Sequence, residues 1–356
     1  MSKKTIAVIF GGQSSEHEIS CLSAENVIRS VNRDKYRMIL VGITKEGHWV
    51  LTDHLKEIED GSWVMGNVTA VLSPDATKKC LYLIDKYRTE EVPIDVIFPV
   101  LHGLYGEDGT IQGIFELSGI PYVGCGVLSS ALCMDKIYTK ILAESLGIRQ
   151  ASYVAVRRNE LEDVETTLRK VETALPYPLF VKPSCAGSSK GVSKVRNREE
   201  LKAALFKAAE EDAKVLVEEC IVGRELECAV FGSDRSVVAS GVGEIRSAAE
   251  FYDYDAKYHN ENSVTDVSPV LPEGVEEEIR EKAEKIFRAA GCYGLSRVDF
   301  FLDDRGVVFN EINTMPGFTA ISMYPMLFEA AGTSKDDLVQ ALIDAAFARE
   351  AGYYKL

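Results

Sequence analysis

Unbroken apolar runs alternate with helical periodicity in the first third of the chain. Three such runs predict β-strands at residues 6–10, 37–43 and 92–100. Apolar residues recur at helical spacing over 19–31, and a short helix is expected over 111–117. Strands that are apolar throughout, with helices between them, indicate a parallel sheet covered on both faces. Residues 52–90 do not follow this pattern, and we expect insertions and an edge strand there.

The pattern loosens in the middle third and changes in the last third. Between 125 and 216, helices are predicted over 129–146, 161–175 and 198–211, and strands over 153–157, 178–182 and 191–195. Farther on, short turns join strands in the manner of an antiparallel sheet at 215–219, 225–231 and 237–245. Further strands are expected at 295–302 and 307–313, with helices at 275–289, 324–331 and 335–349. Residues 246–264 are polar and rich in tyrosine, which predicts a long mobile loop.

Composition and charge narrow the classes of function. The chain has 356 residues, which suggests two or three domains. Its 40 Lys and Arg against 55 Asp and Glu give a net charge of -15. So acidic a protein lacks the basic face that binding to nucleic acid or to an anionic membrane requires. A small anionic ligand is not excluded, because a pocket or a bound cation can reverse the local field.

The cysteines and the apolar runs indicate a cytoplasmic protein. The eight cysteines include no Cys-x-x-Cys pair, so zinc or dithiol chemistry finds no support, and reduced thiols are expected. No apolar run approaches the ~18 residues that a membrane span needs. The apolar stretch at 5–10 is too short for the core of a signal peptide.

The hairpin expected over 295–313 carries the most informative polar residues. With residues 304–306 as its loop, Asp303 pairs with Val307. This register places on one face of the sheet Arg297, Asp299, Glu311 and Asn313, and on the core face Val298, Phe300 and Ile312. Carboxylate and amide oxygens at this density favour Mg²⁺ with phosphate oxygens completing its shell. The alternative is a solvated polar face on which the arginine pairs with the nearer carboxylate.

Three loops that follow apolar strands are candidates for ligand contacts, since open α/β sheets bind ligands at such strand ends. In 182–191, a Gly/Ser-rich loop with lysines near both ends either cradles a phosphate or is an ordinary turn; it is not a P-loop. In 10–20, Glu16 near a helix N-terminus meets either a ligand ammonium or the helix dipole. In 101–110, His102 is either a ligand contact or a capping or structural histidine.

Eight short stretches of the chain stand out when they are taken together. They are Phe10-Gly-Gly-Gln-Ser-Ser-Glu-His-Glu-Ile-Ser20, Leu101-His-Gly-x-x-Gly-Glu-Asp-Gly109, Met134-Asp-Lys136, Val181-Lys-Pro-Ser184, Gly187-Ser-Ser189, Tyr252-Asp-Tyr-Asp-Ala-Lys-Tyr258, Arg297-Val-Asp299 and Asn310-Glu-Ile-Asn-Thr-Met-Pro-Gly-Phe-Thr319. With them, the chain resembles the D-alanine–D-alanine ligases of the ATP-grasp superfamily over almost its full length. Each is weak alone, but their shared order and spacing make chance an inadequate explanation.

The resemblance implies a fold of three parts and a reaction. The parts are an N-terminal parallel α/β (pre-ATP-grasp) substrate-binding domain at 1–124, a central ATP-grasp lobe at 125–216, and a C-terminal ATP-grasp lobe with antiparallel sheet at 217–356. ATP would lie between the two lobes and phosphorylate the carboxylate of one D-alanine. The amine of a second D-alanine would attack this acyl phosphate, giving dipeptide, ADP and phosphate. The family implies a cytoplasmic homodimer that serves peptidoglycan synthesis, cell-wall biogenesis and cell shape.

The resemblance also implies roles for residues at matching positions. Catalytic roles fall on Glu16, Ser188, Tyr258, Arg297 and Gly317. Substrate contacts fall on His102, Ser322 and Met323. ATP contacts fall on Lys136, Lys182, Glu218, Glu219, Ile221, Glu225 and Lys257. The metal ligands would be Asp299, Glu311 and Asn313, which would hold two Mg²⁺ ions, with Mn²⁺ as a possible substitute. Of the tyrosines at 252, 254 and 258, we expect at least one to serve only in packing.

Specificity for the second substrate is the narrower question. Lys257 and Tyr258 disfavour a D-alanine–D-lactate enzyme, and an apolar Met323 suits the methyl group of D-alanine better than a hydroxymethyl group. The stretches 125–133 and 220–231 resemble D-alanine–D-serine ligases, which remain the alternative. A nucleotide-dependent dehydrogenase is opposed by the missing Gly-x-Gly-x-x-Gly, and a non-catalytic binding module by the fact that every expected position is filled.

Overall fold

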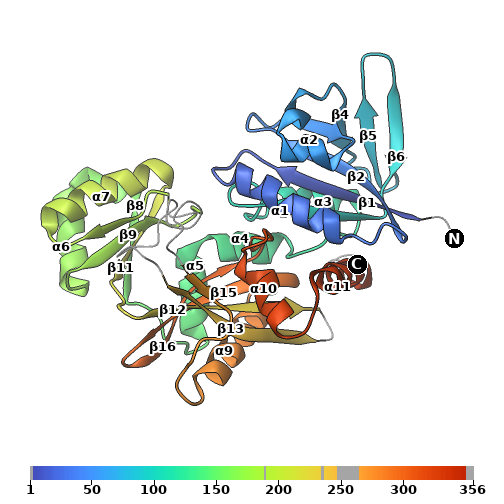
Figure 1. Ribbon diagram of the computed structural model, residues 1–356. Coiled ribbons are helices and arrows are strands. Elements are labelled where there is room, and N and C mark those ends of the chain that lie inside the picture. Colours follow the sequence, from blue (N-terminus) through green and yellow to red (C-terminus); the bar gives the residue numbers. More distant parts are fainter. Residues whose placement is uncertain (1–2, 188–189, 234–235, 247–263, 350–356) are drawn as a thin grey trace.

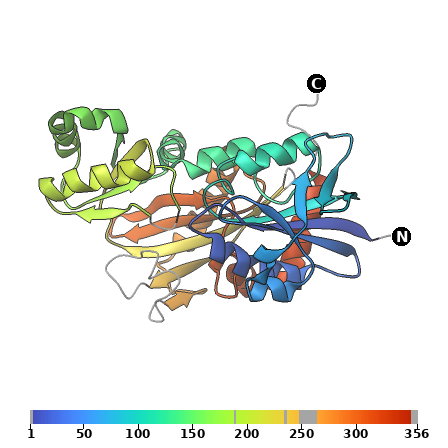
Figure 2. The ribbon, with the colours of Figure 1, turned by 90° about the horizontal axis from the view of Figure 1, so that it is seen from above.

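The computed structural model describes residues 3–187, 190–233, 236–246 and 264–349. Its strands form three sheets, each with its own helices, and Figure 1 shows them as three bodies. Seen from above, the N-terminal sheet and a smaller lobe lie at opposite ends of the molecule (Figure 2). The fold class expected from sequence, α/β followed by antiparallel sheets, is confirmed.

The N-terminal sheet has seven strands in the order β6-β5-β4-β3-β2-β1-β7. The strands are β1 (Lys4–Gly11), β2 (Tyr36–Ile43), β3 (Trp49–Thr52), β4 (Thr69–Leu72), β5 (Cys80–Ile84), β6 (Thr89–Pro93) and β7 (Val96–Leu101). The helices are α1 (His17–Ser30), α2 (Leu55–Glu59), η1 (Ser62–Met65) and α3 (Thr110–Ser118). Alternate residues of β1 enter two different cores: Val8 packs with α1, and Ile9 with α3.

Two expectations for this sheet are wrong. It is parallel only across β2, β1 and β7, and residues 49–93 add four antiparallel strands where one edge strand was expected. The apolar run 92–100 is also not one strand. Asp95 interrupts it, because its carboxylate accepts the Thr5 N–H (2.6 Å) and its own N–H donates to the Thr5 carbonyl (2.9 Å). Strand β6 ends before this point and β7 begins after it.

The smaller lobe is a four-stranded antiparallel sheet in the order β10-β9-β11-β8. Its strands are β8 (Tyr153–Arg157), β9 (Leu179–Pro183), β10 (Ser193–Val195) and β11 (Lys214–Glu219), and its helices are η2 (Arg158–Asp163), α6 (Val164–Ala174) and α7 (Arg198–Glu211). The strand at 214–219 was expected in the antiparallel sheet of the last third but pairs here with β8 and β9. Burial of its central residues 215–217 on both faces gives no sign of which sheet it joins.

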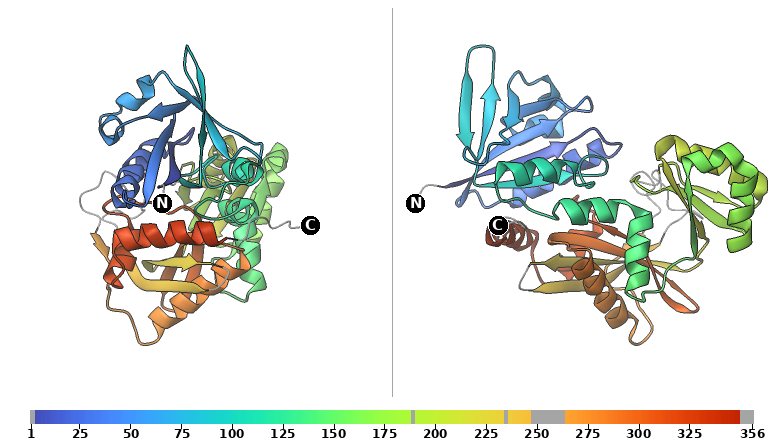
Figure 3. Two further views of the ribbon diagram at one scale, coloured as in Figure 1. Left: turned by 90° about the vertical axis from the view of Figure 1, so that its right-hand side faces the viewer. Right: turned by 180° about the vertical axis from the view of Figure 1, so that it is seen from behind.

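The third sheet is antiparallel, in the order β14-β13-β12-β15-β16. Its strands are β12 (Arg224–Gly232), β13 (Val237–Arg246), β14 (Val264–Asp266), β15 (Gly294–Asp303) and β16 (Gly306–Asn313). Its helices are α9 (Val275–Ala289), α10 (Met323–Ala330) and α11 (Lys335–Ala348). Figure 3 shows α11 lying between this sheet and the N-terminal sheet, and one core joins α1 and β1 to α10 and α11.

Two helices occupy the stretch where one was expected, at 129–146. These are α4 (Val127–Met134) and α5 (Lys136–Ser145), and Asp135 between them has an extended backbone. The Asp135 carboxylate accepts the N–H groups of Ile137 and Tyr138, so it caps the start of α5. Of the part of the chain that the structure describes, no helix combines the length and apolar character that crossing a membrane needs.

Candidate active site

A cavity of about 1040 Å³ opens where the three sheets meet. Its wall includes residues from the N-terminal sheet's loops, from the four-stranded lobe and from the five-stranded sheet. The described candidates on this wall are Glu16, His102, Lys136, Lys182, Glu218, Glu219, Ile221, Glu225, Arg297, Asp299, Glu311, Asn313, Gly317, Ser322 and Met323. Ser188, Lys257 and Tyr258, and the tyrosines at 252 and 254, lie outside the described residues. So do residues 247–263 of the loop expected over 246–264, whose two end residues, Arg246 and Val264, belong instead to strands β13 and β14.

The hairpin β15–β16 presents the polar row predicted from sequence. Asp299 pairs with Glu311 and Arg297 with Asn313, as expected, but by another route. The tip is one residue tighter than predicted, since Asp303 pairs with Gly306 rather than with Val307. A β-bulge at Asn310 then adds one residue to β16 and restores the predicted register. The core face is also as predicted, with Val298, Phe300 and Ile312 buried.

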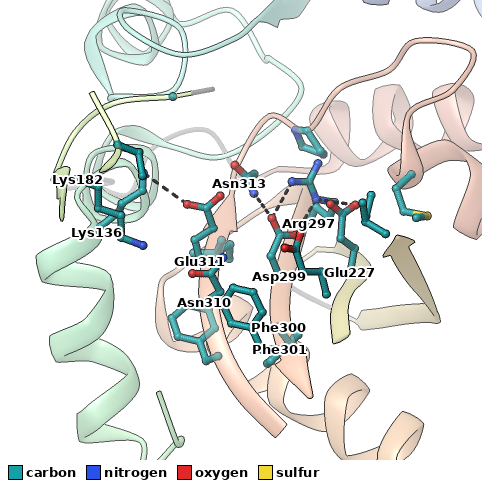
Figure 4. Close-up of a pocket in the computed structure, with 18 of the residues that line it drawn as sticks. Lys136, Lys182, Glu227, Arg297, Asp299, Phe300, Phe301, Asn310, Glu311 and Asn313 are labelled. Atoms are coloured by element: carbon teal, nitrogen blue, oxygen red, sulfur yellow. Dashed lines mark hydrogen bonds and ion pairs between the residues drawn. The ribbon is translucent and has the colours of Figure 1, made fainter. Parts of the chain in front are cut away.

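Arg297 lies among carboxylates on this face. Its guanidinium donates twice to Asp299, from Nε to Oδ1 and from Nη2 to Oδ2, both at 2.7 Å. Its Nε is also 3.1 Å from Oε2 of Glu227, which pairs with Asp299 from the neighbouring strand β12. Figure 4 shows these side chains turned toward one another. Although burial opposes its charge, the carboxylates of Asp299 and Glu227 hold the pKa of Arg297 well above its usual value.

The arginine–aspartate pair of the solvated-face alternative is therefore present, but the face lines a cavity and is at most partly exposed. Asp299 is 9 % exposed and lines the cavity. Asn313 Nδ2 donates to Asp299 Oδ2 at 3.0 Å, so three side chains of the row are in mutual contact. Three carboxylates stand side by side across β12, β15 and β16, namely Glu227, Asp299 and Glu311.

Lys136 reaches this row from the start of α5. Its Nζ lies 3.5 Å from Glu311 Oε2 and donates to the carbonyl of Ala186 at 2.9 Å. Asp135 fixes the turn from which it emerges: the carboxylate accepts from Ser184 Oγ (2.5 Å) and pairs with Lys214. Lys136 thus bridges the Gly/Ser loop of the lobe and the five-stranded sheet.

Glu218 on β11 is shared by two lysines. It pairs with Lys182 and lies 2.5 Å from Nζ of Lys140 on α5. Burial acts to raise the pKa of Glu218, but the two ammonium groups outweigh it and the pKa lies below its usual value. Burial lowers the pKa of Lys140. Glu219, the residue after Glu218, accepts the Ser152 N–H at 2.8 Å. Its carboxylate therefore connects two segments of the lobe, and the residue also lines the cavity.

Glu16 and His102 line the cavity from the N-terminal side. The Glu16 carboxylate fits between two glycines, because a Cβ atom on Gly103 or on Gly187 would collide with it. His102 is buried, which lowers its pKa and keeps the imidazole neutral. Its Nδ1 lies 2.9 Å from the Met315 carbonyl, which can only accept, so Nδ1 carries the proton.

Both ring nitrogens of His102 therefore have protein partners. The second nitrogen, Nε2, lies 3.0 Å from Ser23 Oγ and accepts its hydroxyl proton. Any contact of His102 with a substrate would use ring carbons. This arrangement was not foreseen, because Ser23 and Met315 are distant from His102 in sequence.

The segment from Gly317 to Met323 also lines the cavity, and it follows Met315, whose carbonyl contacts His102. Ser322 Oγ accepts the Thr319 N–H (2.9 Å) and lies 2.8 Å from where a Cβ atom on Gly317 would stand. Met323 begins α10, and its sulfur packs over Gly243 of β13 in the core. Gly317, Ser322 and Met323 all line the cavity, as expected for residues so near one another in sequence.

Comparisons with known proteins agree over the whole chain. A family model described as D-ala D-ala ligase C-terminus matches residues 142–344, and one described as D-ala D-ala ligase N-terminus matches residues 5–125. The D-alanine–D-alanine ligase of Acetivibrio thermocellus is 51% identical over 98% of this chain and 96% of its own length. This chain belongs to the D-alanine–D-alanine ligase family.

Other members of the ligase family support the same assignment. The D-alanine–D-alanine ligase of Caldicellulosiruptor bescii is 47% identical over 97% of this chain and 96% of its own. Among solved structures, the VanG D-Ala:D-Ser ligase of Enterococcus faecalis superposes with a TM-score of 0.88 at 41% identity, covering 97% of this chain and 100% of its own. The Bacillus anthracis D-alanine–D-alanine ligase complexed with ATP superposes at 0.70 and 28% identity, covering 97% and 98%.

In this ligase-family chain, three residues beside the predicted site were missed by sequence reasoning. Lys140 lies on a helix rich in polar residues, where a lysine normally faces solvent, and only its contact with Glu218 shows otherwise. Glu227 alternates with Glu225 on β12 and carries no signal of its own, although strand periodicity places both on one face. Glu107 lies in a recognised stretch but was given no role.

Proposed function

We propose that the protein ligates two D-alanines into D-alanyl-D-alanine at the expense of ATP. The observation that carries the proposal is the polar row of the β15–β16 hairpin facing two lysines across one cavity, in a chain about half identical to D-alanine–D-alanine ligases. A carboxylate is a poor electrophile until it is phosphorylated. The site must therefore bring two anions, ATP and a carboxylate, together, and this requires cationic groups.

The residues expected at the site divide the steps of this chemistry among them. Glu16 holds the ammonium of the first D-alanine, with His102 beside it. Lys136 and Lys182 bind nucleotide phosphates, while the β11 edge and the residues after it, including Glu219, Ile221 and Glu225, line the adenine and ribose. Arg297 and the Gly317 N–H stabilise the negative charge that develops when the second amine attacks the acyl phosphate. Ser322 and Met323 border the second D-alanine. Ser188, Lys257 and Tyr258, outside the described residues, complete the set.

The row fits a hard divalent cation. Asp299 and Glu311 lie directly opposite each other, and Asn313, which donates from Nδ2 to Asp299, brings an amide oxygen to the same face of the sheet. Among the described residues, no group of three His, Cys, Asp or Glu side chains could enclose a metal ion by itself. Phosphate oxygens would complete the shell, as Mg²⁺ prefers, with Mn²⁺ as a substitute. When bound, the ion neutralises charge on the transferred phosphoryl group.

Several properties of the whole enzyme belong to the same proposal. We assign residues 1–124 to substrate binding, and 125–216 and 217–356 to the two lobes that enclose ATP. The product serves peptidoglycan synthesis and thereby cell-wall biogenesis and cell shape, in the cytoplasm where ATP is available. A homodimer formed through the N-terminal domain is consistent with this assignment.

The proposal is tested by the release of ADP from ATP. We expect release that requires both D-alanine and Mg²⁺, with D-alanyl-D-alanine as the product. Glu311→Gln removes a carboxylate from the row and should lower kcat by about 100-fold or more, because charge stabilisation at the phosphoryl group is lost. Asp304→Asn, at the exposed tip of the same hairpin, is the control and should retain activity. Folded parent protein that releases no ADP with D-alanine would refute the proposal.

Use of D-serine as the second substrate is the second candidate. It is favoured by the similarity to the VanG D-Ala:D-Ser ligase. It is opposed by Met323, whose apolar side chain offers no hydrogen bond to a hydroxymethyl group. A competition assay that supplies D-alanine, D-serine and D-lactate with ATP and Mg²⁺ separates the two candidate functions. The dominant product, D-alanyl-D-alanine or D-alanyl-D-serine, identifies the preferred second substrate.

A further inference from the structure

The N-terminal sheet holds the segment that joins β16 to α10. The Met315 N–H donates to Glu107 Oε1 at 3.0 Å, and the Phe318 N–H donates to Ser23 Oγ at 3.1 Å. The Met315 carbonyl accepts from His102 Nδ1 at 2.9 Å. Ser23 lies on α1, His102 follows β7, and Glu107 lies in the next turn. One residue of α1 and two residues of the loop after β7 thus hydrogen-bond to the loop that joins β16 to α10.

The contacts form a continuous chain of hydrogen bonds. The Phe318 N–H donates to Ser23 Oγ, whose proton goes to His102 Nε2, and His102 Nδ1–H donates to the Met315 carbonyl. Ser23, His102, Met315 and Phe318 are all buried. Water therefore does not replace a lost partner easily, and each group in the chain has one orientation that satisfies its neighbours.

Glu107 adds a second anchor to the same segment. Its other carboxylate oxygen, Oε2, accepts the Gly103 N–H at 2.8 Å. The side chain therefore bridges the turn after β7 and the loop after β16 with both of its oxygens. A further link comes from the Met315 sulfur, which lies 3.1 Å from the Leu101 N–H.

These anchors determine where the Gly317 N–H points. Within 315–318, the Met315 and Phe318 N–H groups are used by the anchors, and Pro316 has no N–H. The Gly317 N–H is the amide of this segment that the anchors do not use, and Gly317 lines the cavity together with Arg297. With the backbone held on both sides of it, Gly317 is restrained before any substrate arrives.

We propose that Ser23, His102 and Glu107 are positioning residues of the ligation reaction: they aim the Gly317 N–H at the oxygen on which negative charge develops. This inference rests on the proposed function. It also assigns His102 a task that differs from contact with the substrate. Preorganised donors of this kind act because they need no reorientation during the reaction.

The fall in kcat expected from losing one anchor can be judged from the contribution that a backbone donor of this kind makes to kcat. Removing a donor of this type outright costs about 100- to 1000-fold in kcat. Loosening it should cost less, about 10-fold. In the proposed function, nucleotide phosphates bind at Lys136 and Lys182. These lysines contact Glu311, the Ala186 carbonyl and Glu218, and none of the three anchors. The KM for ATP should therefore stay within about 2-fold.

The primary experiment compares two buried serines of the N-terminal sheet. Ser23→Ala removes the acceptor of the Phe318 N–H, whereas Ser118→Ala, the matched control, removes a hydroxyl that donates to the Phe115 carbonyl (2.7 Å) and accepts the Ile120 N–H (3.2 Å), both far from the 315–318 segment in sequence. Steady-state rates, the KM for ATP, thermal unfolding and the inhibition constant of a phosphinate dipeptide that mimics the tetrahedral intermediate are measured for both. Ser23→Thr, which keeps the hydroxyl, tests rescue.

We expect Ser23→Ala to lower kcat and weaken the phosphinate by about 10-fold each, with the KM for ATP unchanged and recovery in Ser23→Thr. Ser118→Ala should match the parent in all kinetic readouts. If Ser23→Ala and Ser118→Ala behave alike, or if Ser23→Ala loses ATP affinity in proportion to kcat, the positioning role is wrong. Parent protein that does not ligate D-alanine refutes the proposed function instead, so the two failures are distinguishable.

Glu107→Gln provides a second route that does not require Ser23→Ala to fold. Above pH 8, where Glu107 is ionised, the amide keeps one oxygen acceptor and replaces the other with an NH2 donor, so one of the two backbone contacts is lost. The kinetics of this variant and of the parent are therefore compared above pH 8. Alone, Glu107→Gln should lower kcat and weaken the phosphinate by about 10-fold each, with the KM for ATP unchanged, and values equal to those of the parent would overturn the inference.

Where Ser23→Ala folds, the two substitutions are also combined. Kinetic losses of the double variant with Ser23→Ala should be smaller than the product of the single losses, because both act on one segment. Fully multiplicative losses would show that the two residues act independently and would contradict the inference.

Discussion

Buried carboxylates near this site differ according to their neighbours. Glu218 has two lysines and a lowered pKa, whereas burial and the nearby Glu16 raise the pKa of Glu107 to about 8. The Glu107 side chain keeps some exposure to solvent, but protein surrounds it on most sides. Two backbone N–H groups favour its charged form without cancelling these effects.

This pKa predicts how stability depends on pH. In the unfolded chain Glu107 titrates near 4.5, so between about pH 4.5 and 8 the folded state binds a proton that the unfolded state has released. The free energy of unfolding should therefore fall through this range because of Glu107, and level off above pH 8. Glu107→Gln removes the titration, so its stability relative to the parent should rise from pH 5 to pH 8 in denaturant melts.

The control for this measurement is Glu329→Gln on the exposed end of α10. Its stability should run parallel to that of the parent at every pH. Parallel curves for Glu107→Gln as well would show that Glu107 titrates normally in the folded protein.

For single residues, the sequence predicts which side chains belong to the site better than it predicts which side chains contact one another. Arg297, Asp299, Glu311 and Asn313 were predicted to share a face because strand periodicity and one hairpin are local properties. The pairing of Lys140 with Glu218 joins residues 78 positions apart on different elements, and no local pattern contains it.

Among the elements, the break between α4 and α5 has the clearest functional meaning. Asp135 begins α5, and Lys136, its first residue, extends into the cavity. Apolar periodicity continues across the break, which explains why one helix was predicted. An aspartate in this position is a helix-start signal that periodicity alone does not register.

Asp135→Ala should damage both stability and nucleotide binding. The free energy of unfolding should fall by about 2–3 kcal/mol, of which about 1 is the lost cap and the rest is the charged partner taken from Lys214. The KM for ATP should rise by about 10-fold, because Lys136 then leaves a frayed helix end. Chemical denaturation and ATP-dependent kinetics measure the two effects.

Ser334→Ala is the comparison for this variant. Ser334 caps α11 in the same way, by accepting the Asp337 N–H, but on the exposed surface. It should cost about 1 kcal/mol and leave the KM for ATP unchanged. An unchanged KM in Asp135→Ala would show that the cap does not position Lys136.

For the whole molecule, the three sheets do not share their cores equally. The core of the four-stranded lobe draws all its members from residues 154–217. By contrast, one core runs from α1 and β1 to α10 and α11, so the N-terminal and five-stranded sheets pack as a unit. The changes of pattern along the sequence predicted separate bodies, but not which of them pack together, because the packing contacts join distant segments.

Nucleotide binding should therefore stabilise the molecule by joining the lobe to the rest. ATP with Mg²⁺ at 100 times its Kd should add about 2.7 kcal/mol to the free energy of unfolding, and ATP with a chelator less, because Asp299 and Glu311 would then repel the phosphates. Thermal shift assays measure the effect. Lys182→Ala should reduce the shift, whereas Lys202→Ala on the outer surface of α7 should not. Equal shifts with and without Mg²⁺ would contradict the metal assignment.

The bulge at Asn310 makes the hairpin tip independent of the hairpin base. The tip is one residue shorter than the sequence suggested, and the bulge adds one residue to β16. The two differences cancel, so Asp299 still lies opposite Glu311 although the loop at the tip has another length. Arg149 secures the tip from outside by donating to both Asp303 oxygens at 2.8 and 2.5 Å. Extra residues placed between the exposed Asp304 and Arg305 would therefore extend into solvent. This position suits a fluorescent reporter or an affinity tag in an enzyme that must keep its chemistry intact.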